Sequence, residues 1–387
     1  MLNNYFMSED ERSEMALFIE SVEKFCAAEI EPYYADWEKA GIMPRDLYRK
    51  AGAQGLLCVD IPEQYGGIGA TPRFSFAISA TMQRLGYAGF VGGLQVHNDI
   101  IPWYLMHFGT EAQKQQWLPK MATGEVVGAI GMTEPGAGSD LKALRTSARR
   151  DGDSYVINGS KIFISNGQHC DLVVLAAKTN PEAGAKGVSL FLVDTKTPGF
   201  ARGRNLEKIG QHAADTSEMF FDNMRIPADC LLGEEGQGFA YMMRELPRER
   251  LIISLQGVYL AKGARDVTVR YVQERMAFGA PIAQLQNTRF KLAEVETEIA
   301  ASEAFAEACV EAYLRDELTP TAASALKLQT TEMAGRVVDT CLQMFGGYGY
   351  MVEYPISRFF VDARVIRIYG GASEIMKELV ARSMLGR

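Results

Sequence analysis

The sequence lacks the residue patterns that mark several common classes of enzyme. Its four histidines form no HxxE or HExxH pattern, so a metal site is not indicated. No GxSxG segment occurs, which leaves out the nucleophile elbow of serine hydrolases. The six cysteines are scattered without a CxxC pair, as is typical of small buried hydrophobic residues in a reducing compartment.

The sequence also has no excess of positive charge and no long apolar run. With a net charge of −8, a pI near 5.3 and no run of Lys and Arg, it does not suggest a nucleic-acid-binding surface. The longest apolar runs, such as Leu172–Ala177, are too short to span a bilayer. The first residues are acidic and have neither the apolar core of a signal peptide nor the Arg-rich bias of a transit peptide. These features favour a bacterial-type cytoplasmic protein with no membrane span.

The spacing of apolar residues changes twice along the chain. The length of 387 residues suggests two or three domains. Residues 1–125 have mostly helical spacing of apolar residues, residues 126–233 read as short strands, and residues 234–387 are helical again. We therefore predict an α+β multidomain protein with an N-terminal helical domain, a middle β-barrel or sandwich, and a C-terminal four-helix bundle.

Local signals refine this prediction at a few places. Asn158-Gly159 joins two β-rich runs, so a hairpin is predicted within residues 154–165. Long helices are predicted over residues 251–277, 285–313 and 321–345, the last ended by Gly346-Gly347.

Two segments near the start of the β region have features suited to binding a cofactor. In Met132–Leu141 two glycines allow backbone N–H groups to converge on an anion, and two hydroxyls add donors. In Lys161–Gly167 an aromatic residue followed two positions later by a hydroxyl places both on one face of a strand. Taken singly, the first is equally typical of a turn between domains and the second of a half-buried strand. Neither lies in a strand–GxGxxG–helix unit, so a Rossmann fold is not indicated.

Two glycine-rich segments in the helical C-terminal region have a similar character. Phe345–Tyr350 and Ile368–Met376 place glycines at helix boundaries, where the backbone can approach a ligand closely, although each alone is typical of a helix stop. Together with Arg275–Gly279, and in this order, the segments resemble the acyl-CoA dehydrogenase family over nearly the whole chain. Residues 245–251 and 368–379 are most similar to its long-chain-type branch.

The resemblance implies FAD held between the β-domain and the C-terminal helices. By resemblance, contacts to the flavin or pyrophosphate would come from Ile130, Met132, Thr133, Ser139, Phe163, Ile164 and Ser165. Contacts to the FAD of a neighbouring subunit would come from Arg275, Phe278, Gln286, Gln343, Met344, Phe345, Gly346 and Gly347, and those near the adenosine end from Ala372, Ser373 and Glu374. Sharing FAD in this way implies a homo-oligomer, in this family usually a tetramer.

The catalytic base is the main departure from the family pattern. Many members carry a Glu directly after the Tyr of the segment aligned with 368–371, where this chain has Gly370. One branch supplies the carboxylate from another helix, and Glu249 matches that position. Because Pro247 is typical of a helix start, Glu249 is predicted in the first turn, near the positive end of the helix dipole. The alternative is a solvated Glu at a helix N-terminus.

The implied reaction is α,β-dehydrogenation of an acyl-CoA thioester to the trans-2-enoyl-CoA, a step of fatty acid β-oxidation. Glu249 would remove the α-proton while hydride passes to flavin N5, and the backbone N–H of Gly370 with a ribityl hydroxyl would stabilise the enolate oxygen. Substrate contacts are expected from Ser139, Lys186, Pro247, Arg248, Arg250, Gly370 and Gly371.

Several points stay open at the level of sequence. The resemblance points to electron-transfer flavoprotein as the acceptor, but a related flavoenzyme that acts on a carrier-protein thioester or uses oxygen is an alternative. A non-catalytic FAD-containing binding protein is a second one. The length and branching of the acyl group depend on pocket depth, which the sequence does not specify.

Overall fold

The N-terminal region is a set of short helices. In the computed structural model, which describes residues 7–386, the helices before the sheet are α1 (Glu9–Glu29), α2 (Tyr34–Ala40), α3 (Asp46–Ala53), α4 (Pro72–Arg84), α5 (Ala88–Gln95), α6 (Ile101–Phe108) and α7 (Glu111–Ala122). A π-helical turn, Val96–Ile100, joins α5 to α6. Both α1 and α7 begin with a capping box, in which Ser8 pairs with Glu11 and Thr110 with Gln113.

The middle region is an eight-stranded mixed sheet. Its strands are β1 (Gly128–Gly131), β2 (Ser147–Asp151), β3 (Ser154–Ser165), β4 (Leu172–Lys178), β5 (Val188–Asp194), β6 (Phe200–Asn205), β7 (Thr216–Pro227) and β8 (Leu231–Leu232). The order is β6-β7-β3-β2-β4-β5-β8, and β1 lies parallel to β4. Strands β4 and β5 are buried along almost their whole length, because helices pack on one face and side chains from other strands of the sheet pack on the other.

The predicted hairpin at Asn158-Gly159 is wrong. Strand β3 runs unbroken from Ser154 to Ser165, and the pair Asn158-Gly159 sits at a register shift against β7. Gly159 has a φ of 148°, and a Cβ there would come within 2.7 Å of the Thr146 backbone, so the glycine serves a bulge and a close approach. The chain reverses earlier instead, between Asp151 and Ser154, where Gly152 has a φ of 61°.

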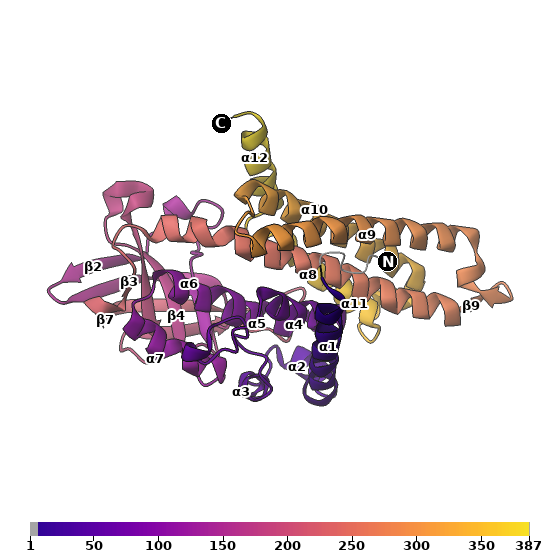
Figure 1. Ribbon diagram of the computed structural model, residues 1–387, viewed down its shortest axis with the longest axis horizontal. Coiled ribbons are helices and arrows are strands. Elements are labelled where there is room, and N and C mark those ends of the chain that lie inside the picture. The colour runs from indigo at the N-terminus through magenta and orange to yellow at the C-terminus, as the bar shows by residue number, and fades with distance from the viewer. Residues whose placement is uncertain (1–6, 387) are drawn as a thin grey trace.

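The C-terminal region is a bundle of long helices, and Figure 1 shows α8, α9 and α10 lying side by side along the longest axis of the molecule. The helices are α8 (Gly238–Glu274), α9 (Gln286–Leu314), α10 (Pro320–Phe345), α11 (Pro355–Ala363) and α12 (Ser373–Met384). A small hairpin of β9 (Met276–Ala277) and β10 (Ala280–Pro281) joins α8 to α9, so α8 ends before the predicted Ala277. A Cβ at Gly257 of α8 would lie 2.8 Å from the Thr330 carbonyl oxygen of α10, so a small residue is needed for this close packing.

Helix α8 connects the two larger parts of the fold. Its start packs on the sheet, where a Cβ at Gly238 would lie 2.8 Å from the Ser189 backbone. Its middle and end form the bundle core with α10. The predicted fold class, helical then β then helical, is confirmed. Over residues 7–386, no helix is long and apolar enough to cross a membrane.

Candidate active site

Glu249 lies in the interior of α8, and the prediction of a helix start at Pro247 is wrong. The helix begins at Gly238 and continues through Pro247, so Glu249 is about three turns from its N-terminus. Proline lacks the N–H that would bond the Met243 carbonyl, but Met242 and Leu251 on either side are buried, and this packing outweighs the lost hydrogen bond. A helix-dipole argument therefore does not apply to Glu249, since that effect fades beyond the first turn.

The carboxylate of Glu249 is instead defined by burial and neighbours. The residue is only 9% exposed, and the Tyr104 hydroxyl of α6 donates a hydrogen bond to its Oε1 over 3.2 Å. Burial, followed by repulsion from Glu245, raises the pKa of Glu249 to about 7. A carboxyl group that titrates near neutral pH is suited to act as a general base.

Two further residues extend this contact between α6 and α8. Glu245, one turn before Glu249, is buried, and its Oε1 lies 2.7 Å from His107 Nδ1. Burial and the two carboxylates, Glu249 before Glu245, raise the pKa of Tyr104 well above its usual range, so its hydroxyl stays a donor. Tyr104 and His107 were not among the predicted site residues, because only the packing of α6 on α8 brings them to Glu249. Glu245 was missed because a helix starting at Pro247 would not have placed it one turn before Glu249.

The two arginines beside Glu249 have different surroundings. Arg248 is buried in an ion-pair network, 2.8 Å from Asp60 and 3.3 Å from Asp99, with its guanidinium over the Trp103 ring. Its charge is thus compensated within the protein, which favours anchoring α8 over the predicted contact with substrate. Arg250 donates from Nη1 to Ser324 Oγ on α10 over 3.1 Å.

Gly370 lies close to the same side of α8 as Glu249. A Cβ at Gly370 would come within 2.2 Å of Ile253 Cδ1, and Ile253 is one helical turn after Glu249. Gly370 and Gly371 have φ angles of 62° and 101°, which a residue with a side chain rarely adopts. We name Glu245, Glu249 and Ile253 the Glu249 face of α8.

A buried lysine holds this glycine turn. Lys327 Nζ of α10 donates to the carbonyl oxygen of Tyr369 over 2.8 Å and to that of Gly371, one on each side of Gly370. Burial, and then the nearby Arg250, lowers the pKa of Lys327 to about 8. The bond to Tyr369 orients the peptide group that contains the Gly370 N–H, and the bond to Gly371 holds the end of the same turn. Sequence reasoning missed Lys327.

A buried ion pair supports the loop predicted to contact the flavin, Met132–Leu141. Lys161 Nζ lies 2.8 Å from Glu134 Oε1 and donates to the Met132 carbonyl, while Glu134 accepts the backbone N–H groups of Arg145 and Thr146. The loop surface is open, since a Cβ at Gly136 or Gly138 would meet nothing within 4 Å. In the same loop Thr133 is half-buried and Ser139 is exposed, and Ile130 and Met132, just before it, are half-buried.

Phe163 departs from regular strand geometry. It has a φ of 61° and lies within the register shift between Lys161 and Ile164, so the alternation used to place Phe163 and Ser165 on one face is interrupted. Nevertheless Phe163 is 64% exposed and Ser165 half-buried, while Ile164 points into the core. An exposed aromatic ring beside an open glycine loop fits a flat cofactor.

The contacts predicted for the FAD of a neighbouring subunit, except Gln286, gather at the far end of the bundle, beside the β9–β10 hairpin. A groove of about 530 Å³ is lined there by Arg275, Gln343, Met344, Phe345, Gly346 and Gly347, among other residues. Gly346 and Gly347 have open space where a Cβ would lie, and Phe278 at the hairpin tip is 96% exposed. We name Arg275, Phe278, Gln343, Gly346 and Gly347 the hairpin end.

The remaining predicted contacts lie outside these two groups. Gln286 is exposed at the first position of α9, and Lys186 is exposed in the loop before β5. At the start of α12, Ser373 is buried and its hydroxyl donates to Glu332 over 2.7 Å, while Glu374 is exposed and Ala372 is half-buried.

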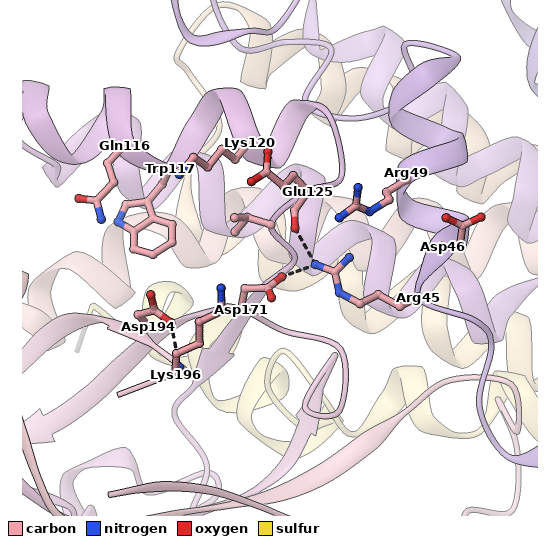
Figure 2. Close-up of a pocket in the computed structure, with 11 residues that line it drawn as sticks. Arg45, Asp46, Arg49, Gln116, Trp117, Lys120, Glu125, Asp171, Asp194 and Lys196 are labelled. Carbon is pink, nitrogen blue, oxygen red and sulfur yellow. Dashed lines mark hydrogen bonds and ion pairs between the residues drawn. The ribbon is translucent and has the colours of Figure 1, made fainter. Parts of the chain in front are cut away.

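A second pocket, of about 500 Å³, lies between α3, α7 and the sheet (Figure 2). Both charge signs line it: Arg45 pairs with Asp171 and donates to the Glu125 carbonyl, and Lys196 lies beside Asp194. None of the predicted site residues lines it, and the mixed charges indicate no particular ligand.

Comparison with known proteins identifies the family. Models of the N-terminal, middle and C-terminal domains of acyl-CoA dehydrogenases match residues 12–125, 129–224 and 236–385, so the chain belongs to the acyl-CoA dehydrogenase family. The mitochondrial long-chain specific acyl-CoA dehydrogenase of Sus scrofa is 46% identical, over 96% of this chain and 87% of the relative. These matches confirm the resemblance drawn from the motifs.

Solved structures agree with this assignment. The acyl-CoA dehydrogenase of Geobacillus kaustophilus superposes with a TM-score of 0.94 at 44% identity, over 98% of this chain and 99% of that one. A glutaryl-CoA dehydrogenase of Mycobacterium smegmatis, solved in complex with FADH2, has a TM-score of 0.91 at 27% identity, over 98% of this chain and 96% of that one. The family is an FAD family, as expected.

Proposed function

We propose that the chain catalyses FAD-dependent α,β-dehydrogenation of a long-chain acyl-CoA, with Glu249 as the base that removes the α-proton. The observation that carries this proposal is the position of Glu249. It is a buried carboxylate with a pKa of about 7, and it lies one helical turn from Ile253, the side chain that packs against Gly370. A carbon acid such as a thioester needs a base close to its α-carbon and donors at its carbonyl oxygen. The Glu249 face would supply the base and the Gly370 turn a donor, both from one chain.

Residues of this chain would orient the thioester and stabilise the charge that develops on it. We propose that the Gly370 N–H donates to the carbonyl oxygen, since Lys327 bonds the carbonyl of the same peptide group, that of Tyr369, and also that of Gly371. Ser139, Lys186, Pro247, Arg250 and Gly371 are proposed to contact the substrate. Arg248 is proposed to act indirectly, because its ion pairs with Asp60 and Asp99 hold the segment that carries Glu249.

FAD is the group that these residues fit. When bound, it supplies the acceptor for the hydride that leaves Cβ. The flavin and pyrophosphate are proposed to lie along the open loop after Met132 and against Phe163 and Ser165, with the adenosine end near Ala372 and Glu374. Exposed glycines and an exposed aromatic ring at this place support the assignment.

The chain is proposed to work as a homo-oligomer, and the expected oligomer is a tetramer. About 26 residues of helix separate Glu249 from Arg275, a span of roughly 39 Å at the rise of an α-helix. One copy is therefore poorly placed to bring its own hairpin end to the FAD beside its own Glu249. The hairpin end, with its exposed Phe278 and open glycines, is proposed to contact the FAD of a neighbouring copy.

Electron-transfer flavoprotein is the proposed electron acceptor, and the cytoplasm the proposed location. Support for the acceptor is the family resemblance alone, and support for a long acyl chain is the similarity to a relative named for that activity. The proposed acceptor is checked by comparing reoxidation of the reduced protein by electron-transfer flavoprotein and by oxygen.

The proposed function is tested by anaerobic titration of the purified protein with acyl-CoAs of increasing length. We expect a yellow protein that releases FAD, not FMN, on denaturation, and whose flavin absorbance bleaches with long-chain acyl-CoA. Matched acyl-pantetheine substrates serve as the control for the carrier, because they keep the thioester and remove the nucleotide. A protein that binds FAD but is bleached by no acyl-CoA would contradict the proposal.

A further inference from the structure

Two pairs of residues face each other where α6 crosses α8. Tyr104 and His107 are three residues apart on α6, and Glu245 and Glu249 are four residues apart on α8, so each pair lies on one face of its helix. The contacts match one to one. The Tyr104 hydroxyl bonds Glu249 over 3.2 Å, and His107 Nδ1 bonds Glu245 over 2.7 Å.

Two buried carboxylates within one helical turn are costly unless something compensates them. The compensation here is unequal. Glu245 has an imidazole at a short distance, and an imidazole can also carry positive charge, whereas Glu249 has a longer bond to a neutral phenol. The better-compensated Glu245 therefore acts on Glu249 as a repelling neighbour, which raises the proton affinity of Glu249.

The other groups around the pair act in a weaker or opposing way. Arg250 lies next to Glu249 on α8 and lowers its pKa, but after burial, Glu245 and Tyr104 in the order of effect. On the α9 side the Tyr313 hydroxyl faces Glu245, but it bonds Arg248. Glu245 thus remains the neighbouring charge with the largest influence on the base.

We propose that Glu245 and His107 are a positioning pair for the reaction: the Glu245 carboxylate sets the proton affinity of Glu249, and His107 holds that carboxylate in place. The proposal rests on the proposed role of Glu249 as base. It assigns Glu245 no contact with the reacting atoms. The pair keeps the proton affinity of Glu249 higher than that of an ordinary glutamate before substrate arrives. Glu249 then accepts a proton from a weak carbon acid more readily.

The test is the pH profile of flavin reduction in the FAD-replete enzyme. Wild type, Glu245→Gln, His107→Gln and the double variant are mixed anaerobically with palmitoyl-CoA from about pH 5.5 to about pH 9. In Glu245→Gln the acid limb is expected to move to lower pH by roughly one unit, because a repelling charge is removed. In His107→Gln it is expected to move the other way, because a neutral amide replaces the imidazole that can carry positive charge beside Glu245.

The double variant separates a paired action from two independent ones. If His107 acts through Glu245, then His107→Gln changes little in the Glu245→Gln background. Glu245→Asp keeps the charge and is expected to keep an acid limb close to wild type, which also covers the case in which Glu245→Gln does not fold. The matched control is Glu298→Gln on α9, an exposed carboxylate paired with Arg336, which should leave the profile unchanged.

The outcomes distinguish the inference from the proposed function. An unshifted acid limb in folded Glu245→Gln, with Glu249→Gln inactive, overturns the positioning pair and leaves Glu249 as the base. Loss of activity in Glu245→Gln as complete as in Glu249→Gln also overturns it, since Glu245 would then move the proton itself. Normal flavin reduction in Glu249→Gln contradicts the proposed function itself.

Discussion

Two regions of the C-terminal domain are built in opposite ways: one lies in the interior of helix α8 and the other just beyond its C-terminal end. The Glu249 face is buried, its two carboxylates have hydrogen-bond partners from α6, and Ile253 packs against the turn at Gly370, which Lys327 of α10 holds. The hairpin end, about 26 residues further along, has an aromatic ring 96% exposed and glycines with empty space above them. The first region is preorganised within one chain, whereas the second has the openness expected of a surface that is completed by a partner. Proton transfer and cofactor retention should therefore respond separately to mutation.

Glu249→Gln should have the largest effect on the first region. We expect flavin reduction by acyl-CoA to fall by at least ~10³-fold, at the upper side of the range for removing a general base. FAD content and acyl-CoA binding should stay near wild type, because the substitution keeps the shape of the side chain. Stopped-flow reduction measures the first effect, and the flavin-to-protein absorbance ratio and a binding titration measure the others. Near-normal reduction would mean that another group takes the proton.

Lys327→Met should have the next largest effect, through the turn at Gly370. Without the two bonds to the Tyr369 and Gly371 carbonyls, the Gly370 N–H is no longer held on the substrate oxygen. We expect a loss of ~10²-fold in flavin reduction, the size associated with a misplacement of about 1 Å. The rate constant should fall more than substrate affinity.

A control within α10 keeps this prediction specific. Thr331→Val removes a buried hydroxyl that bonds only the carbonyl of Lys327 within the same helix, so it perturbs the helix without touching the glycine turn. If flavin reduction falls equally in both variants, the effect of Lys327→Met comes from the stability of α10 and not from the glycine turn.

Changes at the hairpin end should act on FAD and assembly and leave proton transfer intact. For Arg275→Ala with Phe278→Ala we expect FAD to be retained about tenfold less tightly, which corresponds to about 1.4 kcal/mol. A smaller oligomer by light scattering is also expected. With saturating FAD, flavin reduction should approach the wild-type rate. A variant that keeps its oligomeric state and FAD but loses reduction would break the separation between the two regions.

Moving the base to position 370 should have the smallest measurable effect, a partial recovery. Glu249→Gly with Gly370→Glu should reduce flavin a few-fold faster than Glu249→Gly alone, because a carboxylate from either position approaches the same α-carbon. A side chain at position 370 meets Ile253 at 2.2 Å and adopts a φ of 62°, so recovery stays incomplete.

Adding Ile253→Ala to that double variant sharpens the test. It makes room for the new side chain, and recovery should increase if crowding is the limit. A folded, FAD-replete set of variants with no gain over Glu249→Gly for any acyl-CoA would show that positions 249 and 370 do not face the same proton.

The sequence by itself determined the family, the helical–β–helical order and FAD as the cofactor. It did so because short glycine-rich segments such as 132–141 and 345–350 recur at set places along the chain, and because apolar spacing reports local structure. It also pointed to Glu249 as the base, since Gly370 stands where many relatives carry the carboxylate.

Other features were decided only by the tertiary structure. Pro247 and Asn158-Gly159 are local signals for a helix start and a hairpin, yet packing carries α8 and β3 through them. His107, Glu245 and Lys327 gained their roles only where α6, α8, α10 and the Gly370 turn meet. No local pattern marks such residues, because burial and partners far along the chain set both their pKa values and their hydrogen bonds.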